Sequence, residues 1–202
     1  MANTQSQFGF KHLGYLGGGA PDYQQTPYPI LSTYSTVISF GDPVIYSSNG
    51  TIVQATPALT TAASLQGIFV GCSYVPSTGP AVPTWLPYWP GAAATTAVGY
   101  VIDAPNAKFL AAAYNTAIGT TLLGNCVNFT YGGLTAGTTG GAFSVATLDQ
   151  ATATSTGTTA SLLPFKILSM YPGIGNGSDP TTPYNWVVVG FNNQLFRTLT
   201  GN

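Results

Sequence analysis

The side chains that could carry out acid–base or nucleophilic chemistry are few in this chain of 202 residues. It contains one histidine, His12, five aspartates and no glutamate. A serine nucleophile needs a histidine that a rigid scaffold holds within hydrogen-bond reach, and His12 lies in a glycine-rich segment far from any nucleophile motif. We therefore expect His12 to pack or to form hydrogen bonds in an interface, and we expect the chain not to be an enzyme.

Pairs of carboxylates can support acid–base or glycosidase chemistry. Here, however, Asp42 and Asp179 directly precede a proline, and Asp103 lies two residues before one. Aspartate in such turn sequences usually bonds to its own backbone, so we expect all five aspartates to have turn roles. The two cysteines, Cys72 and Cys126, lack metal-binding spacing, and two unpaired buried thiols are expected rather than a disulfide. We expect no cofactor and no metal.

Aromatic residues are the most distinctive local feature. Trp85, Tyr88 and Trp89 lie in a stretch, residues 73–91, that holds five prolines and is therefore predicted to be a structured loop. Such side chains could anchor a protein interface, cap one end of a β-domain or stack on sugar rings. The sequence leaves these three interpretations open.

Charge is unusually scarce. Only 4% of the residues are charged and the net charge is −1, whereas about 25% charged residues is typical. A chain with four basic residues cannot neutralise a run of phosphates, so nucleic acid and anionic membranes are not expected partners. No apolar run approaches the ~20 residues of a membrane span, and no secretion signal is recognisable, so synthesis in a cytoplasm is expected. A surface of neutral polar groups suits a subunit that its neighbours cover.

The elements that must position these residues are predicted to be strands, because no segment has helical periodicity. The fold class expected is all-β, a single antiparallel barrel or sandwich over residues 31–202 with long loops. Residues 1–30 are predicted to be an extended arm that reaches onto a neighbouring subunit or packs along its own domain. Strand candidates are residues 30–34, 37–40, 44–46, 51–53, 67–71, 97–102, 108–113, 119–131, 162–170 and 186–191, with further strands within 132–159. Asn49-Gly50 predicts a tight hairpin inside a meander.

Three parts of the chain resemble the capsid cement (head decoration) proteins of tailed bacteriophages. The first is Gly-Asp-Pro-Val at 41–44, followed by the hairpin, Gly-Thr-Ile-Val-Gln-Ala-Thr at 50–56 and Gly-Ile-Phe-Val-Gly at 67–71. The second is the N-terminal Phe-Gly-Phe-Lys-His-Leu-Gly-Tyr-Leu-Gly-Gly at 8–18. The third is Leu-Pro-Phe-Lys-Ile-Leu at 163–168 with Trp-Val-Val-Val at 186–189 and Asn-Asn-Gln-Leu at 192–195.

The resemblance implies a virion protein on the outer capsid surface, assembled in the host cytoplasm. Its partners would be the major capsid protein and copies of itself, most simply a homotrimer. The expected interface residues are aromatic or amide-bearing: Phe8, Phe10, His12, Tyr15, Trp85, Tyr88, Trp89, Asn192 and Asn193. The alternative is a glycan-binding or adhesive β module, such as a head fibre or receptor-binding piece. A hydrolase is the weakest hypothesis, because its side chains are missing.

Overall fold

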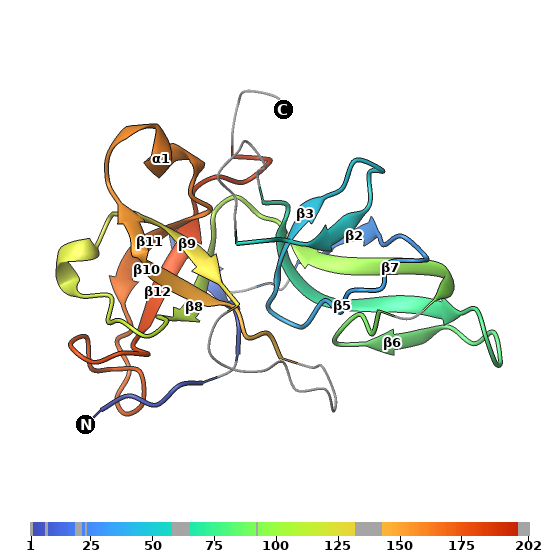
Figure 1. Cartoon of the computed structure of the whole chain (residues 1–202), viewed down its shortest axis with the longest axis horizontal. Helices are drawn as coiled ribbons and strands as arrows, with labels where there is room; N and C mark the ends of the chain where they lie inside the picture. Colours follow the sequence, from blue (N-terminus) through green and yellow to red (C-terminus); the bar gives the residue numbers. More distant parts are fainter. Residues whose placement is uncertain are drawn as a thin grey trace.

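The computed structural model describes residues 2–6, 8–18, 22, 24–57, 65–91, 93–131 and 143–197. In this part of the chain the fold is all-β, as predicted, with two six-stranded antiparallel sheets. Figure 1 shows sheet A in the left half of the molecule and sheet B in the right half. The two sheets pack together as a sandwich, and the described strands do not close into a barrel.

Sheet A has the strand order β1-β8-β12-β11-β9-β10. Its strands are β1 (Lys11–Tyr15), β8 (Ala107–Ala112), β12 (Trp186–Phe191), β11 (Phe165–Met170), β9 (Cys126–Thr130) and β10 (Thr147–Thr154). Side chains alternate between the two faces of a strand, and one face of this sheet is apolar on every strand from β8 to β10. The inward residues of β8, β9, β11 and β12 are Phe109, Ala111, Val127, Phe129, Phe165, Ile167, Val187, Val189 and Phe191.

Sheet B has the order β2-β7-β5-β3-β4, with β6 pairing β5. Its strands are β2 (Thr26–Pro29), β7 (Ala94–Ile102), β5 (Gly67–Pro76), β3 (Pro43–Tyr46), β4 (Ile52–Gln54) and β6 (Thr84–Leu86). One face of this sheet forms a second core, which includes Phe69, Val101 and Trp89. On the other face, Ile68 and Ile102 join the core of sheet A, so the sheets meet at that end of β5 and β7.

The hairpin between β3 and β4 forms where Asn49-Gly50 predicts it, with Tyr46 opposite Ile52. Within the turn, residues 47–50, only Gly50 has a positive φ, which is 72°. Its N–H donates to the carbonyl of Ser47 at 3.0 Å. The turn is therefore not the primed type expected, in which Asn49 would be left-handed too, but an ordinary turn followed by a left-handed glycine. The predicted meander is also wrong, because β5 pairs β3 rather than β4.

Short helices occur in two places where the sequence predicts strands. The helix α1 (Gly157–Leu162) directly precedes β11, and a 3-10 turn, η1 (Thr120–Leu122), precedes β9. Elsewhere the strand candidate at 37–40 contributes only isolated bridges, Ile38 with Trp89 and Phe40 with Phe143. The expectation of further strands in 132–159 is met by β10, whereas residues 132–142 lie outside the described part of the chain.

Among the described residues of the predicted arm, 1–30, two strands belong to the sheets of the same chain. Strand β1 pairs β8 at the edge of sheet A, and β2 pairs β7 at the edge of sheet B. Phe10 is fully buried in the sheet A core. The expectation that the arm reaches away onto a neighbouring subunit is therefore wrong for these strands, because they complete this chain's own hydrogen-bond ladders.

The first residues of the chain are held by the loop between β11 and β12. The buried Asn3 side chain accepts a hydrogen bond from the N–H of Gly177 at 2.9 Å and donates to the carbonyl of Asp179 at 2.8 Å. The Asn176 side chain binds the N-terminal segment in the same way: it accepts a hydrogen bond from the N–H of Thr4 at 2.6 Å and donates one to the Thr4 carbonyl at 3.0 Å. Each amide side chain thus replaces a backbone partner and fixes the N-terminal segment on this loop.

Asp42 lies where the N-terminal segment and both sheets meet. Its carboxylate is 1% exposed and accepts hydrogen bonds from the N–H of Ser39 at 2.8 Å and from Gln54 Nε2 at 2.7 Å. The neighbouring Gly41 carbonyl accepts from the N–H of Phe10, which belongs to the sheet A core. This one turn therefore joins β3 and β5 of sheet B to the first strand of sheet A.

Candidate functional site

One face of sheet B is only partly covered by sheet A. Strand β5 carries a bulge between Phe69 and Gly71, after which Gly71, Ser73 and Val75 share the face of Ile68. On β7, Val98 and Tyr100 share the face of Ile102. The end of this face at Ile68 and Ile102 packs on sheet A. The remainder extends past sheet A and reaches solvent.

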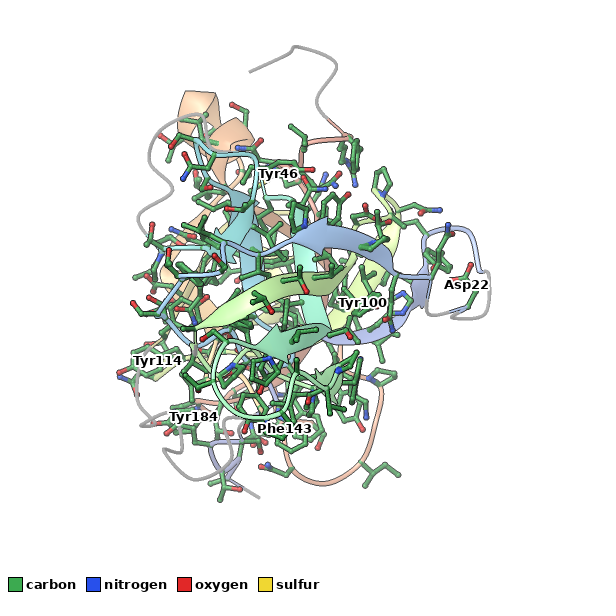
Figure 2. The ribbon with its side chains drawn as sticks, turned by 90° about the vertical axis from the view of Figure 1, so that its right-hand side faces the viewer. Asp22, Tyr46, Tyr100, Tyr114, Phe143 and Tyr184 are labelled. Carbon is green, nitrogen blue, oxygen red and sulfur yellow. The ribbon has the colours of Figure 1, made fainter. Side chains whose placement is uncertain are left out.

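We call this remainder the aromatic face: Ser73, Val75, Trp85, Val98 and Tyr100, bordered by Pro27 and Pro29. Trp85 is 58% exposed, whereas Val75, Val98 and Tyr100 are half-buried. Figure 2, in which the sheet B end of the molecule faces the viewer, marks Tyr100. The face contains no charged residue, which is unusual for an exposed sheet surface and favours contact with an apolar or neutral partner.

The Trp85 ring can lie close to the backbone of β5 because residue 71 is a glycine. A Cβ atom at position 71 would lie 2.8 Å from the indole ring and 2.9 Å from the carbonyl of Leu86. The bulge and the glycine therefore let β6 approach β5 closely, with Ser73 opposite Trp85. The outcome is a planar indole ring presented to solvent on a rigid support.

Pro27 and Pro29 protect the free edge of sheet B beside this face. The N–H of Ile30 donates to the carbonyl of Ala97 on β7 at 3.0 Å. Because N–H groups alternate in direction along a strand, those of residues 27 and 29 would point away from the sheet. Proline has no N–H, so the edge offers no donors there to another strand. A partner is thus directed to the face of the sheet rather than to this edge.

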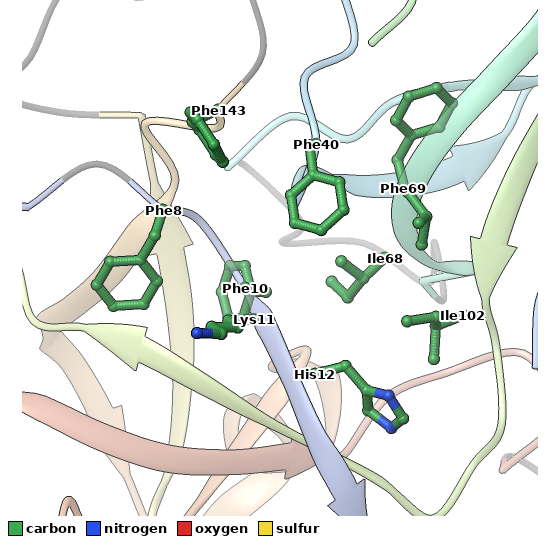
Figure 3. Close-up of a pocket in the computed structure, with 10 residues that line it drawn as sticks. Phe8, Phe10, Lys11, His12, Phe40, Ile68, Phe69, Ile102 and Phe143 are labelled. Carbon is green, nitrogen blue, oxygen red and sulfur yellow. The ribbon is translucent and has the colours of Figure 1, made fainter. Parts of the chain in front are cut away.

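A pocket of about 380 Å³ adjoins the covered end of this face (Figure 3). Its apolar lining comes from β5 and β7 of sheet B, from the segment before β1 and from two residues outside the strands, and comprises Phe8, Phe10, Phe40, Ile68, Phe69, Val70, Ile102 and Phe143. Lys11 and His12 of β1 complete it. Phe143 is 60% exposed and lies edge-on to Phe40, with ring centres 6.3 Å apart. The volume is at the lower end of the range for ligand sites, about 300–1,000 Å³.

The lining of the pocket carries almost no charge. Lys11, which is exposed, is the one charged residue in its lining. Burial lowers the pKa of His12, which a hydrogen bond with the carbonyl of Gly14 at 3.1 Å and the charge of Asp22 partly oppose. The imidazole is therefore mainly neutral near pH 7. The pocket can hold an apolar group and one anion at its rim.

The predicted N-terminal site residues lie in β1 or just before it, and they do not form one surface. Phe8 is half-buried against Trp186, with ring centres 5.1 Å apart, and lines the pocket. Phe10 is buried, with its ring 4.2 Å from that of Phe165. His12 is also buried, and the hydroxyl of Tyr15 donates to Asp22. Phe10 and His12 are thus core residues whose inner sides line the pocket, and Phe8 is the more accessible group.

The residues of the predicted aromatic loop also differ in how exposed they are. Trp89 is fully buried in the sheet B core, and its indole N–H donates to the carbonyl of Tyr34 at 2.9 Å. Tyr88 is half-buried, and Trp85 stands on the aromatic face. Trp89 is therefore a core residue and not an accessible binding group, whereas Trp85 keeps the interface and glycan interpretations open.

Asn192 and Asn193, predicted as interface residues, are used inside the fold. The amide of Asn192 donates to the carbonyls of Ala160 and Leu163 at 2.8 and 2.7 Å, and that of Asn193 donates to the carbonyl of Leu162 at 3.1 Å. They thereby satisfy the last carbonyls of helix α1, which has no side-chain cap at its start. Their contacts are structural, which corrects the expectation that they face a partner.

The sequence interpretation missed Tyr100 and Phe143, and a periodic signal for Tyr100 was available. Val98, Tyr100 and Ile102 alternate with the small residues Ala97 and Gly99, which indicates two different faces of one strand. Phe143 follows a Gly/Thr-rich stretch and has no comparable pattern. Its place beside Phe40 depends on an isolated bridge between segments about 100 residues apart, which local sequence cannot encode.

The groups considered for catalysis are dispersed or used in turns. Four aspartates accept a hydrogen bond from a nearby backbone N–H, as predicted; they are Asp22, Asp42, Asp149 and Asp179. Asp103 differs, because it accepts from the hydroxyls of Thr26 and Tyr28 across the sheet. Both cysteines are free and buried, as expected.

Within the described residues, no three histidine, cysteine or acidic side chains come together as metal ligands. The helices in that part of the chain are likewise too short and too polar to cross a membrane. The geometry gives two adjacent binding features, the aromatic face and the pocket, both apolar and both nearly free of charge. No protein family, no curated protein and no solved structure gives a significant match to this chain.

Proposed function

We propose that the protein is a non-catalytic structural subunit that attaches to the outer surface of a tailed-phage capsid and stabilises the shell by bridging neighbouring capsid subunits. The observation that carries this proposal is the aromatic face, a rigid exposed surface without charge on a chain that has only nine charged residues. Interfaces of stable complexes are depleted of charge at their centre and enriched in tryptophan and tyrosine.

Attachment through this face would depend on apolar burial and hydrogen bonds. Trp85 and Tyr100 would fill depressions in the major capsid protein, while Val75 and Val98 would exclude water around them. Ion pairs at a surface are screened within a Debye length of about 8 Å at physiological ionic strength, whereas apolar burial is not weakened by salt. Binding should therefore persist in molar salt, and particles without the protein should break at a lower temperature.

The test compares Trp85→Ala with Leu123→Ala on capsids that lack the protein. Both side chains are exposed and apolar, but Leu123 lies beside η1, away from the aromatic face. We expect the Trp85 variant to lose capsid occupancy and to leave the particle's melting temperature at its unprotected value, with Leu123→Ala unchanged. Equal occupancy of the two variants, or particles equally robust with and without the protein, would contradict the proposal.

A glycan-binding or adhesive module is the second candidate, and the presentation of Trp85 favours it. A flat exposed indole with a hydroxyl nearby, that of Ser73 on the paired strand, is suited to stacking on a sugar ring. In that case Trp85→Ala should abolish adsorption to host cells while particle stability stays the same. The same variant therefore separates the two functions.

A further inference from the structure

The loop between β11 and β12, residues 171–185, presents a fully exposed apolar side chain. Ile174 is 101% exposed, the largest value among the exposed apolar residues of the described chain. Gly173 and Gly175 flank it, so neighbouring side chains do not shield it. Isolated exposed apolar residues are common on protein surfaces. Ile174 differs from most of them because the loop that carries it has a fixed shape.

Hydrogen bonds at both ends fix the loop that carries Ile174. The N–H of Trp186 donates to the carbonyl of Gly177 at 2.8 Å, and the N–H of Tyr171 donates to the carbonyl of Trp186 at 3.1 Å. The buried Asn3 side chain holds the same loop from the N-terminal segment. An isoleucine on such a supported loop can enter a partner's pocket without first losing the conformational freedom of a mobile loop.

The pocket beside the aromatic face is a complementary receptor on the same chain. Five phenylalanines contribute to its lining, and Figure 3 shows them arranged around it: Phe8, Phe10, Phe40, Phe69 and Phe143. Its volume of about 380 Å³ is ample for a branched aliphatic side chain with part of its loop. The rim offers the positive charge of Lys11 and no acidic group.

Charge and position both favour the Ile174 loop as the occupant. The turn after Ile174 is closed by the N–H of Ser178 donating to Gly175, and Asp179, the only charged residue of the loop, follows directly. The Asp179 carboxylate is half-buried and accepts hydrogen bonds from the N–H and the hydroxyl of Thr181, so it gives this loop one fixed negative charge, opposite in sign to that of Lys11. The ring of Trp186 contacts Tyr171 of this loop and Phe8 of the pocket lining, so the two features lie near each other on the molecule.

We propose that copies of this chain associate by insertion of the Ile174 loop of one copy into the phenylalanine-lined pocket of another. Two different patches of one chain meet in this contact, so it closes as a reciprocal pair or as a head-to-tail ring. The inference rests on the proposed function and deepens it, because it adds a contact between copies of the chain to the contact with the capsid. Its test uses the isolated protein, so self-association and capsid attachment can each fail without the other.

The test is sedimentation of the purified full chain over a wide range of concentrations. We expect the wild-type chain to form a defined oligomer, and Ile174→Asn to sediment as a monomer with an unchanged unfolding midpoint. Lys11→Glu, which changes an exposed rim residue, should weaken the oligomer at low salt. Leu123→Asn replaces another exposed apolar residue and should assemble as the wild type does.

A mixing experiment tests the direction of the contact. Phe143→Ser removes a wall of the pocket but keeps the Ile174 loop, whereas Ile174→Asn keeps the pocket. Each variant alone should be monomeric, and an equimolar mixture should form a mixed dimer through the one intact loop and the one intact pocket. A monomeric wild-type chain at every concentration, or an Ile174→Asn chain that assembles like the wild type, would overturn the proposal.

Discussion

Protonation of Asp42 should contribute stability to this protein as the pH falls from about 7 to about 4, because Asp42 binds its proton more tightly in the folded chain than in the unfolded one. Burial raises the pKa of the Asp42 carboxyl from 3.8 to about 6, although hydrogen bonds from Ser144, Ser39 and Gln54 act in the opposite direction. A shift of about 2 units at 1.36 kcal/mol per unit corresponds to about 3 kcal/mol. This stabilisation is complete below the unfolded pKa and is lost as the pH rises through about 6.

The perturbation that tests this is Asp42→Asn, which keeps the shape and one acceptor oxygen but has no charge to desolvate. The Asn amide can donate to the Ser144 hydroxyl, while its oxygen accepts from Ser39. We expect the variant to be more stable than the wild type by up to about 3 kcal/mol at neutral pH and to lose the advantage near pH 4.

The assay is urea unfolding of both proteins from about pH 4 to about pH 8, with the free energy difference plotted against pH. His12 titrates in the same window with the opposite sign, because burial lowers its pKa. Both proteins retain His12, so its contribution cancels in the difference. A difference that stays constant across this range, or a variant that is less stable at neutral pH, would refute the reasoning.

Three further predictions concern the core and its polar contacts. Phe165→Ala should lower the free energy of unfolding by about 3–5 kcal/mol in denaturant titrations, since this ring is fully buried; a loss below about 1 kcal/mol would contradict the packing. Asn185→Ala should cost at least about 2 kcal/mol, because it leaves the buried N–H and carbonyl of Ile118 unpaired, and an unchanged midpoint would count against it. Burial raises the pKa of the Cys72 thiol to about 12 and also raises that of Cys126, so neither should react with a thiol reagent until the chain unfolds; rapid native labelling would disprove this.

Local sequence predicts the strands whose apolar side chains alternate and fails where tertiary contacts decide. Strand β12 (Trp186–Phe191) has the predicted bounds, because a β-branched run of this kind suits a buried strand. Helix α1 was not predicted, since Gly-Thr-Thr-Ala-Ser-Leu has weak helix formers and no apolar period. Its carbonyls are satisfied by Asn192 and Asn193, which lie about 30 residues further along the chain.

The candidate site shows the same limit. The sequence singles out Trp85 and Trp89 equally, yet one stands on the surface and the other is fully buried. Their exposure differs because Gly71, after the bulge in β5, has no Cβ atom and leaves room for the Trp85 ring on the surface of the sheet. A bulge changes the face on which every later residue of its strand lies, and it leaves no reliable mark in composition. The sequence therefore indicates which residues could bind but not which of them are accessible.

The contacts of residues 2–6 have a consequence for the order in which the protein folds during synthesis on the ribosome. The partner of Asn3 at Asp179 lies 176 residues further along the chain. At about 5–20 residues per second, the N-terminal segment must wait roughly 10–35 s before that partner has been synthesised. Phe10 waits almost as long for Phe165, on which its ring stacks. During translation this aromatic segment is therefore exposed to solvent and to chaperones until residues 165–179 have been synthesised.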